Sequence, residues 1–242
     1  MKRIISISTG CMFNPYLKED LNKDIKLLSK LDIDGLEFLI ADAINLLSFR
    51  LKKETIRILR RYKFNTIHAP FHLAEESLEF SNNKRSQRIM AKIYEIYDQI
   101  NAVDINIHPH QIKSYKIFDT KNYQHSIENM EMHHELDIRY YSKILKKNPS
   151  FKLVLDTTHA SEGGELNQLF KAFKQKIIYS HLSANYFNHL HLPFHALNKE
   201  YLKPFEIIKK GNFPIVLENQ IGSKDVKEYK KEIEFVRKWL NQ

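Results

Sequence analysis

The chain has 242 residues, 43% of them hydrophobic, which is enough for a substantial core, and we expect one domain over residues 1–242. It has no run of about 18 apolar residues, which argues against a membrane span, and its single cysteine, Cys11, excludes an internal disulfide and indicates the cytoplasm. The net charge of +9 favours an anionic partner, although much of the lysine lies in stretches such as KDVKEYKKEIEFVRKW, where a solvated helix face explains it equally well.

Eight short apolar runs alternate with amphipathic segments. In chain order they are RIISIS, GLEFLI, FNTIHA, DINIH, HSIEN, FKLVLD, KIIYSHLS and FPIVLEN, and they end near Ser8, Leu39, His68, His108, Glu128, Asp156, His181 and Glu218. Their mean spacing is roughly 30 residues, the size of one βα unit. Eight such units predict an α/β fold, a (β/α)8 TIM barrel. The alternative, an open doubly wound sheet, is disfavoured by the eightfold count and by the absence of G-x-G-x-x-G after the first run.

The segments between these runs have the spacing of amphipathic helices. Intervals of four, four and three residues separate Leu17, Leu21, Ile25 and Leu28. Intervals of three and four residues separate Val226, Tyr229, Ile233, Val236 and Leu240. Residues 109–124, PHQIKSYKIFDTKNYQ, are too few and too broken by proline and aspartate for a full helix. We therefore expect the fourth helix of the barrel to be reduced.

Metal-ligand residue types end six consecutive runs. They are His68, His108, Glu128, Asp156, His181 and Glu218, and His110 and His159 follow two of them closely. In this kind of barrel the carboxyl ends of the strands meet at one rim, where active sites lie. Each residue alone has an ordinary explanation, such as a helix cap for Asp156 or a core position for His68. Together, imidazoles and carboxylates are the ligands of zinc or manganese, and they predict a metal site at this rim.

The stretch NHLHLPFH, residues 188–195, adds three histidines after the seventh run. His189 and His191 are two residues apart, and on an extended stretch they point the same way. They could supply further metal ligands, or they could belong to a histidine-rich surface loop. His195 follows Pro193, and we assign it no role.

The order of these motifs resembles that of a known family. IHAP, HP, IEN, LDTTH, SHLS, HLP and VLEN occur along nearly the whole chain in the order typical of the xylose isomerase-like barrel superfamily, or AP endonuclease family 2, which includes endonuclease IV-type enzymes. The resemblance implies a shared metal core of Glu128, Asp156, His181 and Glu218. For the endonuclease branch it implies two further zinc ligands, His68 and His108, and a third zinc held by His159, His189 and His191. The family has aspartate where this chain has His189, and glycine where it has His195. His110 is expected beside the ligands, as a substrate-binding residue.

Three functions remain open on this basis. The first is a phosphoesterase resembling endonuclease IV, with two or three zinc ions and a phosphate-bearing substrate such as DNA with abasic sites. The second is a sugar or sugar-phosphate isomerase or epimerase with one ion, either zinc or Mn²⁺ or Mg²⁺, in which Glu128 and Glu218 are the catalytic residues and move a proton. The third is a barrel that binds a ligand without turnover. The histidines in excess of one metal's needs favour the phosphoesterase. The absence of a glycine-rich first loop, like the one that probes DNA in the endonucleases, weighs against it.

Overall fold

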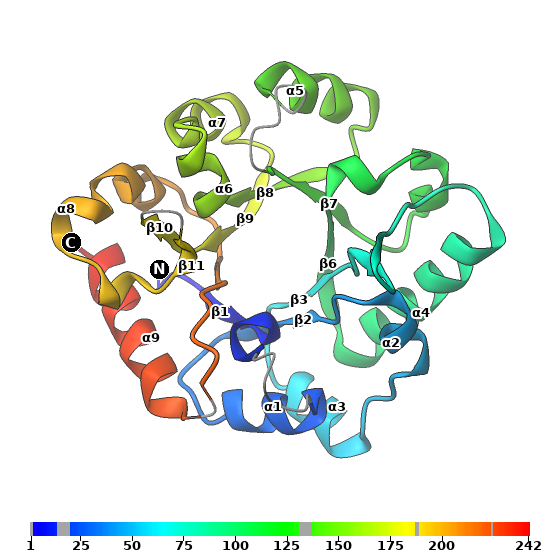
Figure 1. Cartoon of the computed structure of the whole chain (residues 1–242), viewed down its shortest axis with the longest axis horizontal. Helices are drawn as coiled ribbons and strands as arrows, with labels where there is room; N and C mark the ends of the chain where they lie inside the picture. Colours follow the sequence, from blue (N-terminus) through cyan, green and yellow to red (C-terminus); the bar gives the residue numbers. More distant parts are fainter. Residues whose placement is uncertain (1, 14–19, 131–136, 187–188, 224) are drawn as a thin grey trace.

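A computed structural model describes residues 2–13, 20–130, 137–186, 189–223 and 225–242. Eight parallel strands close into a barrel in the order β1-β12-β9-β8-β7-β6-β3-β2, with helices around it (Figure 1). The strands are β1 Ile5–Ser8, β2 Gly35–Leu39, β3 Asn65–His68, β6 Ala102–Ile107, β7 His125–Glu128, β8 Lys152–Asp156, β9 Ile177–Leu182 and β12 Ile215–Leu217. The predicted TIM barrel is confirmed, and its strands end within one residue of the eight expected positions.

Helices occupy the segments between the strands. They are α1 Leu21–Leu28, α2 Ala43–Ser48, α3 Lys53–Leu59, α4 Lys84–Ile100, α5 Ile138–Lys147, α6 Thr157–Glu162, α7 Leu166–Phe173, α8 Lys199–Leu202 and α9 Val226–Leu240. The expected helix at the end of the chain is α9, and α1 begins at Leu21, since Leu17 lies outside the described residues. None of the helices in the described ranges combines the length and the apolar character that crossing a membrane requires.

Shorter elements complete the loops. The 3-10 turns are η1 Thr9–Met12, η2 Pro109–Gln111, η3 Tyr115–Phe118, η4 Phe194–Ala196 and η5 Lys203–Lys210. Two antiparallel hairpins pair β4 His72–Leu73 with β5 Glu76–Ser77, and β10 Ala184–Tyr186 with β11 His189–Leu192. Every residue between β6, the fourth strand of the barrel along the chain, and β7 is described, and the only helical pieces there are the turns η2 and η3. This confirms that the helix after the fourth strand is reduced.

Successive side chains of a barrel strand point alternately toward the surrounding helices and into the barrel interior. Ile5 and Ile7 of β1 belong to the large core that also contains helix residues, while Ser6 and Ser8 alternate with them. Inside the barrel, a small apolar cluster contains Phe64, Val154, Tyr179 and Val216. Polar side chains follow at the carboxyl ends of the strands. The interior therefore becomes polar at the rim where the candidate site lies.

Candidate metal centre

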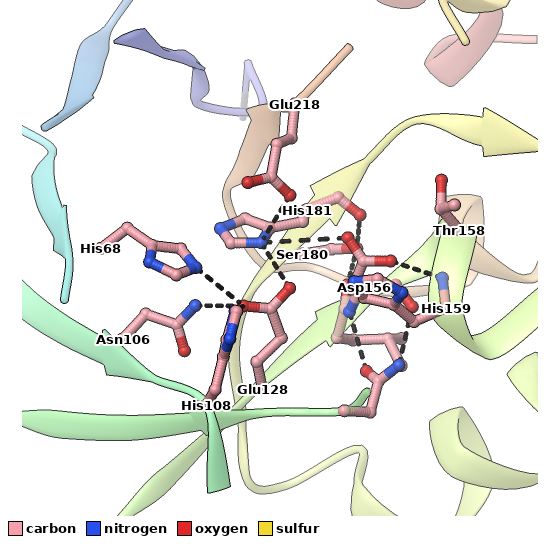
Figure 2. Close-up of polar contacts among 12 residues, drawn as sticks. His68, Asn106, His108, Glu128, Asp156, Thr158, His159, Ser180, His181 and Glu218 are labelled. Carbon is pink, nitrogen blue, oxygen red and sulfur yellow. Dashed lines mark hydrogen bonds and ion pairs between the residues drawn. The ribbon is translucent and has the colours of Figure 1, made fainter. Parts of the chain in front are cut away.

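The strand-end residues converge into two groups that share Glu128. His68, His108 and Glu128 form one group, and Glu128, Asp156, His181 and Glu218 form the other (Figure 2). Within each group, one ligand atom per residue lies within 4.8 Å of all the others. The structure thus brings together the six residues that the strand-end pattern singled out. Their function as metal ligands stays a prediction.

Glu128 faces both groups with different oxygens. Its Oε2 lies 3.3 Å from Nε2 of His68 and 3.8 Å from Nε2 of His108, and it accepts a hydrogen bond from the Asn106 amide. Its Oε1 lies 3.0 Å from Nδ1 of His181. The side chain is almost fully buried, so it is shielded from water on either side. Glu128 would therefore serve as a ligand in either group.

His181 has acidic residues against both of its ring nitrogens. Nδ1 lies 3.1 Å from Oε2 of Glu218 and 3.9 Å from Oδ2 of Asp156, on the same side as Glu128. Nε2 lies 3.1 Å from Oε2 of Glu37, a buried glutamate of β2. Glu37 was missed in the sequence because only the ends of the apolar runs were considered. Its signal is a carboxylate inside GLEFLI, where burial is costly unless the charge is paired.

Asp156 combines a structural contact with a free oxygen. Its Oδ1 accepts a 2.6 Å hydrogen bond from the backbone N–H of His159, which caps α6. Asn129 fixes its backbone through hydrogen bonds of 2.8 and 2.9 Å. Oδ2 is buried and has no hydrogen-bond partner among the described residues. A buried carboxylate oxygen without a partner is costly, and a cation would satisfy it.

The two histidines next to Glu128 have opposite protonation tendencies. Burial alone would lower the pKa of His68, but the hydrogen bond and charge of Glu128 raise it to about 9. Burial and the neighbouring His68 lower the pKa of His108 to about 3. His108 is therefore neutral at pH 7 and can offer a lone pair to a cation, whereas His68 must first lose a proton.

The acidic residues around His181 also differ from one another. Burial would raise the pKa of Glu128 and Glu218, but the charge and hydrogen bond of His181 hold Glu128 well below its usual range and Glu218 at about 2. Burial raises the pKa of Asp156 to about 6. Burial alone would lower the pKa of His181, but the carboxylates of Glu218, Glu37 and Glu128 raise it well above the ordinary value. The protonated imidazoles of His68 and His181 thus balance part of the carboxylate charge.

The expected third group is not assembled by the described residues. His159 and His191 lie with ring centroids 5.4 Å apart, and Nδ1 of His191 lies 3.1 Å from the Ser183 hydroxyl and 4.0 Å from Oε2 of Glu218. His189 is exposed and does not join them in a ligand group. That His189 and His191 point the same way stays a prediction; His191 has φ +55°, which departs from the extended backbone that this alternation assumes.

His110 and His195 are members of neither ligand group. His110 is exposed, with its ring centroid 5.6 Å from that of His108, and its substrate-binding role stays a prediction. His195 contacts the buried Glu232 of α9 through Nδ1 at 2.7 Å. Glu232 also accepts hydrogen bonds of 2.9 Å from the backbone N–H groups of Phe194 and His195. His195 therefore has a structural contact that joins η4 to α9.

Comparison with known proteins places the fold. No protein-family model matches the chain, and no curated protein sequence matches it. Among solved structures it is similar to endonuclease IV from Thermus thermophilus (12% identity, TM-score 0.62, 98% of this chain and 99% of the other covered). An AP endonuclease, family 2, from Brucella melitensis (12%, TM-score 0.65, 98% and 99%) and a 3-keto-D-glucoside 4-epimerase from E. coli (11%, TM-score 0.65, 99% and 99%) are also similar. The chain therefore has a TIM-barrel fold that it shares with these two endonucleases and this epimerase.

Proposed function

We propose that the protein is a metal-dependent phosphoesterase that uses two divalent cations, zinc in the first place, to hydrolyse a phosphodiester. The observation that carries this proposal is the second ligand group. His68 and His108 both turn Nε2 toward Oε2 of Glu128, while the other oxygen of Glu128 faces His181. An enzyme with one metal has no need of this arrangement, whereas paired metal sites are typical of phosphoester hydrolysis.

The residues present suit divalent cations. His68, His108 and Glu128 would hold one, and Glu128, Asp156, His181 and Glu218 would hold the other. Oδ2 of Asp156, which has no hydrogen-bond partner among the described residues, and the neutral ring of His108 could each donate a lone pair to a cation. The chemistry that such ions supply when bound is charge neutralisation on the phosphate and a lowered pKa of water. Mn²⁺ and Mg²⁺ are alternatives, and the imidazoles favour zinc or manganese over magnesium.

The substrate that we propose is an anionic phosphodiester, with DNA containing an abasic site as the specific candidate. Two of the similar structures are an endonuclease IV and an AP endonuclease. The net charge of +9 favours a polyanion. His110 is exposed beside His108, and there it can contact a substrate phosphate.

A sugar or sugar-phosphate epimerase is the second candidate. Glu128 and Glu218 lie 3.0 and 3.1 Å from the same nitrogen of His181, so that one metal could sit between two carboxylates able to exchange a proton with a substrate. The third ligand group of an endonuclease is not assembled by the described residues, because His189 is exposed. A 3-keto-D-glucoside 4-epimerase is among the similar structures.

One set of variants distinguishes these activities. The wild-type protein, supplied with zinc, is assayed for cleavage of an abasic-site duplex and of a simple phosphodiester, and for solvent-proton exchange into ketoses and ketose phosphates. We expect the wild type to cleave the phosphodiester substrates. His108→Ala should lose one bound ion and the cleavage activity, and Glu128→Gln should lose both bound ions and the activity. His125→Asn is the matched control, because His125 is also buried but lies at the opposite end of β7 from Glu128.

The outcome for His108→Ala decides between the candidates. Proton exchange that survives in this variant, without any phosphodiester cleavage by the wild type, would replace the phosphoesterase by the epimerase. Metal binding without either activity would support a barrel that binds a ligand but does not turn it over.

A further inference from the structure

Glu37 is a buried carboxylate whose contacts converge on one oxygen. Oε2 accepts hydrogen bonds from the Thr66 hydroxyl at 3.0 Å and from the Tyr179 hydroxyl at 3.3 Å, and Nε2 of His181 lies 3.1 Å away. Burial raises the pKa of Tyr179 well above its ordinary value, so this hydroxyl keeps its proton. Three neighbours from β3 and β9 thus fix the position of Oε2 inside the barrel.

This contact determines which nitrogen of His181 would keep its proton when the other holds a cation. Nε2 faces Glu37, while Nδ1 faces Glu128 and Glu218 at 3.0 and 3.1 Å, and a carboxylate can only accept a hydrogen bond, so the protonated ring donates from both nitrogens. A cation held by Glu128 and Glu218 would take the place of the Nδ1 proton, and the remaining proton would then be the Nε2 proton that Glu37 accepts. We propose that Glu37 is a positioning residue of the metal centre, which holds His181 with Nε2 protonated and Nδ1 directed at the cation. This inference rests on the proposed metal-dependent function.

His68 is held by a backbone carbonyl in the way that His181 is held by the Glu37 carboxylate. Nδ1 of His68 lies 2.8 Å from the backbone carbonyl oxygen of Ala69, which leaves Nε2 for Glu128 and the cation. Both imidazoles are therefore held at the nitrogen that faces away from the site, one by a neutral carbonyl and one by a charge. A carboxylate partner makes a ligating imidazole more basic and fixes its orientation, which strengthens metal binding.

Glu37 also changes the charge of the interior. With Glu128, Asp156 and Glu218 it makes four carboxylates around one histidine, and two divalent cations would balance their formal charge. Asp104, the next buried carboxylate, adds little at pH 7, because burial raises its pKa to about 8. The charge of Glu37 therefore favours occupancy by two cations over occupancy by one.

The test compares Glu37→Gln with Asp104→Asn. Both replace a fully buried carboxylate on the strands that flank β3, but among the two only Glu37 contacts His181. We expect zinc affinity to fall by about tenfold or more in Glu37→Gln, and to stay within about threefold of wild type in Asp104→Asn. Tyr179→Phe, which removes one donor to Glu37, should give a smaller loss in the same direction and serves if Glu37→Gln does not fold.

A spectroscopic readout separates positioning from general destabilisation. In protein labelled with ¹⁵N-histidine, the Nε2 proton of His181 should be seen with and without zinc in the wild type, and should be shifted or lost in Glu37→Gln. An unchanged proton and unchanged zinc affinity in Glu37→Gln, or an equal loss of affinity in Asp104→Asn, would overturn the role of Glu37. A wild-type protein that binds no zinc would instead refute the proposed function, and the zinc-free spectra would still decide whether Glu37 orients His181.

Discussion

At the scale of single residues, the candidate metal centre holds a proton at an atom that would bind a cation. His68 has its pKa raised to about 9 by Glu128, against the effect of burial. A ligand must be unprotonated, so below this pH a zinc ion has to displace the proton of His68. We therefore predict that zinc binding releases protons and that affinity rises by about tenfold per pH unit for each proton displaced. Calorimetric titrations in buffers of different ionisation enthalpy between pH 6 and 9 measure this release. An affinity that is constant over this range would contradict the protonation of His68.

The contact between His195 and Glu232 gives a second prediction. The hydrogen bond and charge of Glu232 raise the pKa of His195, against burial. A histidine whose pKa is raised on folding stabilises the fold fully below its unfolded pKa near ~6.5, and this contribution is lost as pH rises through the folded pKa. Glu232→Gln should cost about 2 kcal/mol, because its amide would face donors that the carboxylate now accepts. In urea unfolding, the difference from wild type should be larger at pH 6 than at pH 9. An equal difference at both values would exclude a charged His195.

Which site residues the sequence could reveal depends on their position in a strand. His68, Glu128 and Asp156 end apolar runs, so the common rim of a parallel barrel was enough to bring them together. Glu37 lies inside a run, and its partner His181 is 144 residues away, a pairing that no local pattern contains. His191 is partly buried beside exposed His189 and has a positive φ, and spacing reveals neither property.

At the scale of elements, β2 has a glycine where a side chain cannot fit. A Cβ on Gly35 would collide with the backbone carbonyl of Phe64 and lie 2.7 Å from the Ser6 hydroxyl oxygen. Because a backbone atom cannot rotate away, Gly35→Ala should cost about 3 kcal/mol in urea unfolding. Gly164→Ala is the control: it has open space but φ +69°, and it should cost only about 1 kcal/mol. If the two variants lose the same stability, the close approach of β2 to Phe64 does not constrain the barrel.

Strands and long helices were the predictable elements, and the hairpins were not. The barrel strands are buried on both faces, but in β1 and β6 isoleucine alternates with serine, aspartate or asparagine. Their short isoleucine-containing runs still stand out between the helical segments. The spacing of Val226 to Leu240 likewise marks α9. The hairpin β10–β11 has no such pattern, because it lies on the surface of the barrel rim and its strands are short and only partly buried. The register shift between Ala184 and Tyr186 and the positive φ of His191 also depart from a regular hairpin, and residue spacing does not predict either of them.

At the scale of the whole molecule, the similar structures have one fold but different named activities. Identities of 11–12% over nearly the whole chain connect it with both endonucleases and an epimerase. A barrel of this kind supports many reactions, since the helices and strands provide stability and the rim residues provide chemistry. The choice between a phosphoesterase and an epimerase therefore depends on how many cations the rim binds.

The most direct test is the position and number of metal ions at the barrel rim. Anomalous scattering at the zinc edge, from crystals grown with zinc above pH 7, locates them without any assumption about substrate. The account predicts two strong peaks, one among His68, His108 and Glu128 and one among Glu128, Asp156, His181 and Glu218. A single peak in the second group, with none beside His68 and His108, would contradict the two-metal phosphoesterase.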